Sequence, residues 1–268
     1  MSAHERKTNS AAPALARSTR RRLGGLALVL LGIVAATVWT HRRHIADELL
    51  RTEPAQILKT PALLREAMRI ARPQYQRHCQ ICHGSAFQGD AALGAPNLAG
   101  NVWLYGDDPV DVERTILYGI RSGHPKSRNL TDMPALVRMG QITADDARDA
   151  AEYLQSLAGR PYEKAAALRG RSIYYNKGNC FDCHANDAKG VTDYGAPALT
   201  GPIWIYGGDR ESLYQSIVNG RHGKCPAWVN VLTPVQIRAL ALYLVAVPRL
   251  SAPQLNTGGP LGGARRIF

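Results

Sequence analysis

The chain contains two short segments whose residue types and spacing could carry redox chemistry, because residues 79–83 and residues 180–184 both read C-x-x-C-H. Two thiols three positions apart can each form a thioether with a vinyl group on one edge of a porphyrin, and the adjacent histidine then lies under the iron. A dithiol or zinc-binding C-x-x-C is the alternative for a single motif, but two copies in a matching context favour covalent haem. We therefore expect two haem c groups, attached at Cys79 and Cys82 and at Cys180 and Cys183, with His83 and His184 as iron ligands.

The two motifs lie in an internal repeat. At a shift of 101 residues, Gly-Ala-Pro at 94–96 aligns with Gly-Ala-Pro at 195–197, and Trp-Leu-Tyr-Gly at 103–106 aligns with Trp-Ile-Tyr-Gly at 204–207. The shift then falls to 92 and finally to 90, which gives the first copy a longer loop. A unit of about 90 residues has been duplicated, so the fold should be built from two similar halves.

Each half is predicted to be mostly helical, with Gly- and Pro-rich loops in between. Asp108 and Asp209 are suitable N-caps, and Thr143 and Thr233 each open a capping box. So much loop leaves a thin core, and the haems would supply the missing apolar mass. The expected helices cover residues 73–80, a segment after Pro109, 143–157, 165–178, a segment after Asp209 and 233–246.

The positive charge is concentrated near the N-terminus. The 268 residues carry a formal net charge of +12, and residues 1–51 hold nine Lys/Arg against three Asp/Glu, which is half of that excess. The remaining residues contain no long basic run, so the sequence does not favour nucleic-acid binding. Residues 23–40 are uncharged, and their length of 18 residues is at the lower edge of what can cross a bilayer core as a helix.

The arginines that precede the apolar segment, Arg20 to Arg22, favour an N-terminus in the cytoplasm and a periplasmic location for the residues after the segment. A cleaved signal peptide is the alternative, but the apolar run is long and a small-residue cleavage site is poorly defined. Attachment of haem c outside the cytoplasm agrees with this orientation, in a bacterial inner membrane. The expected organisation is a cytoplasmic N-terminus at 1–22, a transmembrane anchor at 23–40, a linker at 41–70, domains at 71–159 and 160–250, and a flexible tail at 251–268.

The order of motifs resembles a known family. C-x-x-C-H, then Gly-x-Pro-x-Leu, then a distal Met-Pro before a closing helix is similar to a class I cytochrome c domain. The tandem pair, the single anchor and the Trp-x-Tyr-Gly stretches resemble the dihaem subunit (subunit III) of cbb3-type cytochrome oxidases. The resemblance implies an all-α fold of two tandem class I cytochrome c domains after one transmembrane helix. It also implies that the carbonyls of Pro96 and Pro197 accept hydrogen bonds from the proximal histidines.

The distal ligand of the first haem is expected to be Met133, which is followed by Pro and matches the family's distal position. Met139 is the rival, with simple core filling as its alternative role, and Met68 precedes the first haem motif. Ligation by His and Met raises the potential of a haem, because the soft thioether favours ferrous iron.

The second haem is expected to lack a methionine ligand, because no methionine follows residue 139. Cys225, the fifth cysteine, stands where the family has methionine, and a thiolate there would lower the potential of this haem. Arg221, His222 and Lys224 would favour the thiolate by their charge. The alternatives are a free thiol beside a five-coordinate iron, or ligation by His222 or Lys224.

These features predict a membrane-anchored cytochrome of a respiratory chain without a catalytic site of its own. The resemblance implies transfer of electrons to a membrane oxidase, with a soluble or membrane cytochrome c or a quinol-oxidising complex as donor. A dihaem peroxidase needs one high-potential haem and one open iron, and the matched Met-Pro and Cys-Pro positions argue against it. A cytochrome subunit of a periplasmic dehydrogenase and a redox sensor are further alternatives.

Overall fold

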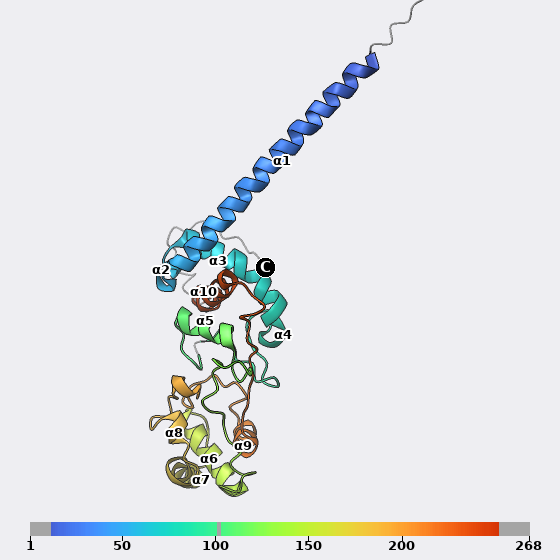
Figure 1. Ribbon diagram of the computed structural model, residues 1–268. Helices are drawn as coiled ribbons and strands as arrows, with labels where there is room; N and C mark the ends of the chain where they lie inside the picture. Colours follow the sequence, from blue (N-terminus) through green and yellow to red (C-terminus); the bar gives the residue numbers. More distant parts are fainter. Residues whose placement is uncertain (1–11, 101–102, 252–268) are drawn as a thin grey trace, which may run out of the picture. The chain divides into compact units, whose positions relative to one another are not determined.

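The computed structural model describes the backbone of residues 12–100 and 103–251, and the chain divides into two compact units at Glu48 and Leu49 (Figure 1). The expected N-terminus at 1–22 and tail at 251–268 lie largely outside the described residues. The α-helices are α1 Ala12–Arg51, α2 Pro54–Leu58, α3 Pro61–Gln74, α4 Gln80–His83, α5 Pro109–Tyr118, α6 Ala144–Leu157, α7 Lys164–Ser172, α8 Phe181–His184, α9 Arg210–Asn219 and α10 Pro234–Ser251. Two π-helical turns, η1 Tyr75–Cys79 and η2 Ile173–Lys177, and one 3-10 turn, η3 Thr192–Tyr194, complete the helical elements.

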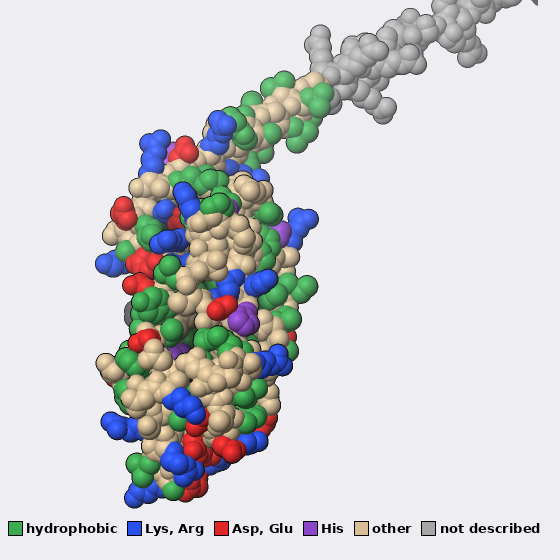
Figure 2. Space-filling view, turned by 60° about the horizontal axis from the view of Figure 1, so that its bottom comes forward, with side chains coloured by type: hydrophobic (Ala, Val, Ile, Leu, Met, Phe, Trp, Pro, Cys, Tyr) green, Lys and Arg blue, Asp and Glu red, His purple; other side chains and the backbone are tan. Residues whose placement is uncertain are grey.

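Helix α1 is long and apolar enough to cross a membrane over Gly25–Arg51. At a rise of 1.5 Å per residue these 27 residues extend about 40 Å, more than the roughly 30 Å of a bilayer core. Its apolar side chains from Leu26 to Trp39 are exposed and are drawn green in Figure 2, whereas Ile45 and Leu49 near its end are buried. The helix extends beyond the expected end of the anchor at residue 40. The segment expected to be a linker, residues 41–70, is therefore mostly helical, in α1, α2 and α3.

The second unit is all-helical in the part of the chain that the structure describes, where β-pairing is confined to isolated bridges. The predicted caps are confirmed: the Asp108 side chain accepts from Val110 N–H, and Thr143 and Asp146 form a reciprocal capping box. Helix α3 begins twelve residues earlier than the expected start at 73, at Pro61, and α10 continues through Pro248 to Ser251.

The helices of the second unit gather in two groups. Helix α10 packs on α3 and α5, while α6 packs on α7 and α9 (Figure 1). Each group thus takes its closing helix from the other repeat. In the expected organisation, residues 71–159 and 160–250 would each contain their own closing helix. The connection from Leu157 to Lys164 is short, and short connections make consecutive helices neighbours, so α6 lies against α7.

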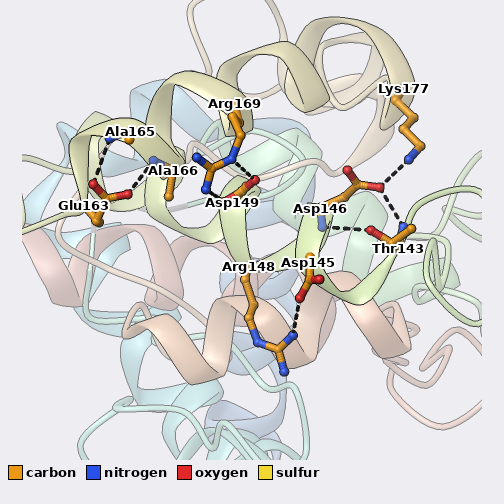
Figure 3. A network of polar contacts seen from close by, with 10 residues as sticks. All are labelled: Thr143, Asp145, Asp146, Arg148, Asp149, Glu163, Ala165, Ala166, Arg169 and Lys177. Carbon is orange, nitrogen blue, oxygen red and sulfur yellow. Dashed lines mark hydrogen bonds and ion pairs between the residues drawn. The ribbon is translucent and has the colours of Figure 1, made fainter.

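A polar network ties α6 to the second repeat (Figure 3). Arg169 of α7 donates from Nε and Nη2 to the two carboxylate oxygens of Asp149, at 2.6 and 2.7 Å. Lys177 of η2 pairs with Asp146. The buried Gln155 donates to the carbonyl of Gly208, just before α9, at 2.5 Å. The same face of α6 is also held by apolar contacts, since Tyr153 and Leu154 belong to a buried cluster with residues of the second repeat.

Candidate haem sites

Each C-x-x-C-H motif begins where a π-helical turn ends. In the first motif η1 ends at Cys79, and in the second η2 ends at Lys177, shortly before Cys180. Each motif then closes with one turn of helix, α4 or α8, that ends at the histidine. Single π turns are rare and occur often at functional sites, so the same irregularity in both copies marks the two motifs as equivalent sites.

The two motif histidines are held in the same way. His83 Nδ1 lies 3.1 Å from the carbonyl oxygen of Pro96, and His184 Nδ1 lies 2.9 Å from that of Pro197. A carbonyl only accepts, so the proton of each ring lies on Nδ1 and the lone pair of Nε2 is left for a metal. Burial lowers the pKa of both histidines, which favours the neutral ring that a metal requires.

A tyrosine fixes the backbone after each histidine. Tyr75 donates from its hydroxyl to the carbonyl of Gly84 at 2.7 Å, and Tyr174 donates to the carbonyl of Ala185 at 2.6 Å. Both tyrosines are almost fully buried. Neither was singled out from the sequence, although each stands a few residues before its motif. The pair of hydroxyls holds the end of α4 and α8 in equivalent positions.

Met133 lies in the second group of helices. It packs against the cluster around Tyr174, together with Cys180, Phe181 and Trp204. Its backbone pairs with that of Arg221, with N–H···O distances of 3.0 and 3.1 Å. The sequence order had suggested a position beside the first motif.

Cys225 lies in the first group of helices. Its backbone pairs with that of Ile120, at 2.9 and 3.0 Å. Burial and, to a lesser extent, the neighbouring Cys82 raise the pKa of the Cys225 thiol, in keeping with a position near the first motif. Three residues on, the Trp228 ring lies 5.0 Å from the ring of His78, next to Cys79. The structure thus brings Cys225 toward the first motif, whereas the sequence order had suggested the second.

Comparison with known proteins identifies both halves. Residues 71–158 match the family model for cytochrome c, and residues 165–244 match the model for cytochrome c oxidase, cbb3-type, subunit III. The subunit CcoP of Cereibacter sphaeroides is 32% identical over 200 residues, which cover 75% of this chain and 68% of the relative. This chain belongs to the CcoP/FixP family of cbb3-type cytochrome c oxidase subunits. Both repeats are therefore cytochrome c domains that bind covalent haem c, as the motifs predicted.

Two further CcoP/FixP relatives are similar to the chain. FixP of Bradyrhizobium sp. strain ORS 278 is 39% identical over 191 residues, 71% of this chain and 64% of the relative. CcoP of Azospirillum brasilense is 38% identical over 199 residues, 72% of this chain and 66% of the relative. The chain spans just under two thirds of the length of these relatives.

The side chains around the second motif fit a haem of the CcoP/FixP type. Trp204 Nε1 is buried without a hydrogen-bond partner among the described residues, in the cluster that also holds Cys180 and Met133. A buried N–H without an acceptor costs free energy, so an acceptor belongs beside it. A haem propionate supplies such an oxygen, and the porphyrin face supplies the apolar mass that the loops lack. When bound, the haem provides one-electron redox chemistry at its iron.

Burial favours the neutral form of the thiols of Cys79, Cys180 and Cys225. Burial raises the pKa of Cys79 to about 12 and that of Cys180 to about 11. Burial likewise raises the pKa of Cys225 to about 11. The expected lowering of the Cys225 pKa by Arg221, His222 and Lys224 is not found; burial raises this pKa instead.

The charged residues before Cys225 have other partners. Arg221 donates to the Ser216 hydroxyl and lies over the Tyr206 ring at 4.1 Å. His222 Nδ1 lies 2.7 Å from a carboxylate oxygen of Asp132. The imidazole of His222 is thus engaged at the surface, which weakens it as the alternative ligand.

The remaining methionines differ in environment. Met139, the rival ligand, is 67% exposed and lies at the surface, so it does not fill a core. Met68 lies half-buried on α3. Met133 is the methionine whose surroundings suit a haem ligand.

Proposed function

We propose that this chain is a membrane-anchored dihaem subunit that carries electrons to the oxygen-reducing subunit of a cbb3-type cytochrome c oxidase. The observation that carries the proposal is the presence of two cytochrome c sites in one compact unit, in a chain whose relatives are named as subunits of that oxidase. An electron that enters at one haem can leave at the other without diffusion of a separate carrier.

The contact between the repeats supports transfer inside the unit. The position of a Cβ added to Gly94 is 2.3 Å from the Tyr206 hydroxyl, and that of a Cβ added to Gly195 is 2.4 Å from the Tyr105 hydroxyl. Each tyrosine of the Trp-x-Tyr-Gly stretches thus lies on the loop that follows the motif of the other repeat. The two haem-binding loops are held against each other by these reciprocal contacts.

The donor is a soluble or membrane-bound cytochrome c or a quinol-oxidising complex. The haem domains lie in the periplasm and residues 1–22 in the cytoplasm, as the arginines before the apolar run favour. The chain itself carries electrons and contributes no site for oxygen.

Purification of the affinity-tagged full chain from solubilised membranes tests this function. We expect the oxygen-reducing subunit to copurify, and we expect the pre-reduced haem c groups of the complex to be oxidised rapidly on mixing with oxygen. Purification of the chain without an oxidase, or haem oxidation at the same rate in a strain that lacks the oxidase, would overturn the proposal.

Carbon monoxide and peroxide separate this function from that of a dihaem peroxidase. A carrier with two six-coordinate irons binds carbon monoxide slowly and turns over no peroxide. Ready binding at one haem together with peroxide turnover would support the peroxidase.

A further inference from the structure

We propose that each haem takes its distal side from the other repeat, so that Cys225 faces the haem of residues 79–83 and Met133 faces the haem of residues 180–184. This pairing is the reverse of the one expected from the order of the sequence. It rests on the two haem c groups alone and does not depend on which complex receives the electrons.

The first support is a pair of reciprocal backbone contacts, each of them an isolated β-bridge. Ile120 exchanges two backbone hydrogen bonds with Cys225, and Arg221 exchanges two with Met133. In the repeat, Ile120 corresponds to Arg221 and Met133 corresponds to Cys225. The two pairs are therefore one contact made in both directions between the repeats.

A glycine precedes Ile120 and another precedes Arg221, and each allows the two paired backbones to approach closely. The position of a Cβ added to Gly119 is 2.3 Å from the carbonyl oxygen of Cys225. That of a Cβ added to the equivalent Gly220 is 2.4 Å from the carbonyl oxygen of Met133. The segment that carries each distal residue thus passes directly over the C-terminal end of α5 or α9, where only a glycine leaves room for it.

The second support is the exchange of closing helices. Tyr243 of α10 contacts Tyr75 with ring centroids 5.9 Å apart, and Tyr153 of α6 contacts Tyr174 at 5.5 Å. Tyr243 and Tyr153 are equivalent positions of the two closing helices. Each therefore packs on the tyrosine that holds the motif of the other repeat.

Polar contacts of the closing helices follow the same exchange. Arg238 of α10 pairs with Glu113 of α5, and the equivalent Arg148 of α6 lies over the Tyr214 ring of α9 at 4.9 Å. Arg238 and Glu113 are both largely shielded from solvent, with side chains 16% and 18% exposed. The closing helix and the segment that carries the distal residue thus both pack on the other repeat.

The distal residues then reach different motifs. Met133 shares a cluster with Cys180 and Phe181. On the other side, the N–H of Trp228 donates to the carbonyl of Ile116 at 3.1 Å, which fixes the Cys225 strand beside α5 in the first group. Both distal positions are therefore on the group that contains the opposite motif.

The exchange assigns the two haem potentials. A thioether favours ferrous iron and a thiolate favours ferric iron, so the haem of His184 and Met133 is the one with the higher potential. The haem of His83 and Cys225 has the lower potential. Coordination of Cys225 sulfur requires loss of the thiol proton, which binding to iron drives.

The test marks one haem while both are kept in the full chain. Cys79→Ala leaves that haem with one thioether and one free vinyl group, which conjugates with the porphyrin and moves its α band to longer wavelength. Redox titrations can then be followed separately at the shifted and unshifted bands. Cys180→Ala marks the other haem in the same way and is the matched control.

In the Cys79→Ala background we expect Cys225→Met to raise the midpoint potential of the shifted haem and to leave the unshifted haem unchanged. We expect Met133→Leu to lower the potential of the unshifted haem alone and to let it bind carbon monoxide when reduced. Met139→Leu, at an exposed position, should change neither haem. In the Cys180→Ala background the two bands should exchange these responses.

Pairing within each repeat predicts the opposite assignment, so a response of the shifted haem to Met133→Leu would overturn the proposal. A response of neither haem to either variant would overturn it as well. If the Met133→Leu chain fails to mature, electron paramagnetic resonance of the oxidised Cys225→Ser variant decides. A change confined to the signal of the haem of residues 79–83 is expected, and a change in the signal of the other haem would contradict the exchange.

Discussion

The backbones of Met133 and Arg221 exchange two hydrogen bonds, although the two residues come from different copies of the repeat. This pairing carries the Met133 loop away from α5 and toward the helices of the second motif. The closing helix α6, which follows the loop, then packs on α7 and α9. The passage of the chain from the first repeat to the second near Met133 thus sets the position of both the distal residue Met133 and the closing helix α6.

Gly119→Ala should destabilise the protein far more than Gly123→Ala. Both glycines have a positive φ, +71° and +84°, but a Cβ at Gly119 would lie 2.3 Å from the carbonyl oxygen of Cys225, whereas none of the described atoms lies within 4 Å of a Cβ at Gly123. We expect a cost of about 1 kcal/mol for Gly123→Ala and at least about 2 kcal/mol more for Gly119→Ala. Thermal unfolding of the haem-bound proteins measures the difference. Equal melting temperatures would show that the Cys225 segment does not pass close to Gly119.

Ile237→Ala should loosen the first haem site although Ile237 belongs to the second repeat. The side chain is fully buried on α10, which packs on α3, so we expect a loss of about 2–5 kcal/mol. Val231→Ala, at a position 60% exposed, is the control and should cost well under about 1 kcal/mol. Hydrogen exchange measures the local opening of each motif. In Ile237→Ala we expect the exchange rate of the backbone amides of α4 to increase more than that of the amides of α8. Increased exchange at α8 alone would contradict the packing.

Asp146 should make the stability of the second helix group depend on acid pH. The hydrogen bond from Lys177, with those from Thr143, lowers the pKa of Asp146 to about 2. Because the folded-state pKa is depressed, the stabilisation is present above pH 4 and is lost as the pH falls toward 2. Asp146→Asn should therefore lower the melting temperature at pH 6, and the difference from the parent protein should shrink toward pH 2.

Asp145→Asn is the matched control for this prediction. It removes the same charge from the same turn of α6, but the side chain of Asp145 is 93% exposed and, within the described part of the chain, pairs with Arg148 alone. We expect a much smaller change in melting temperature at pH 6. A constant difference between Asp146→Asn and its parent from pH 6 to pH 2 would contradict the assigned role of Lys177.

Removal of the apolar helix should release the haem-binding unit from the membrane. The second unit begins at Leu49, so replacement of residues 1–48 by a cleavable export signal leaves it whole. We expect the haem c of this variant in the soluble periplasmic fraction and that of the full chain in the membrane fraction. Haem-stained gels of the two fractions measure the distribution, and haem in the membrane fraction of the shortened chain would show a second anchoring surface.

The motifs, the repeat and the helix starts marked by capping residues could be predicted from the sequence because each depends on residues close together in the chain, whereas the start of α3 and the end of α10 were wrong. The capping box of Thr143 and Asp146 fixed the start of α6, and Asp108 fixed the start of α5. The hydrogen bonds of Pro96 and Pro197 to the two histidines also match the pattern implied by the resemblance.

The partner of each closing helix could not be predicted in the same way. The two helices occupy equivalent positions in the repeat, so position alone does not say which copy each one packs on. The choice is made by the connections, and the one signal available in the sequence is the short segment between Leu157 and Lys164, which keeps α6 beside α7. Position in the repeat identified Met133 and Cys225 as distal residues but carried no information on which motif each one meets.

Magnetic circular dichroism of the oxidised full chain with Cys79→Ala and Cys82→Ala tests the central claim most directly. This variant keeps only the haem of residues 180–184, and ferric haem with an axial methionine shows a characteristic near-infrared charge-transfer band. The exchange of distal sides predicts that the methionine band is retained and that Met133→Leu abolishes it. A single-haem protein without the methionine band, in a chain whose two-haem parent shows it, would contradict the account.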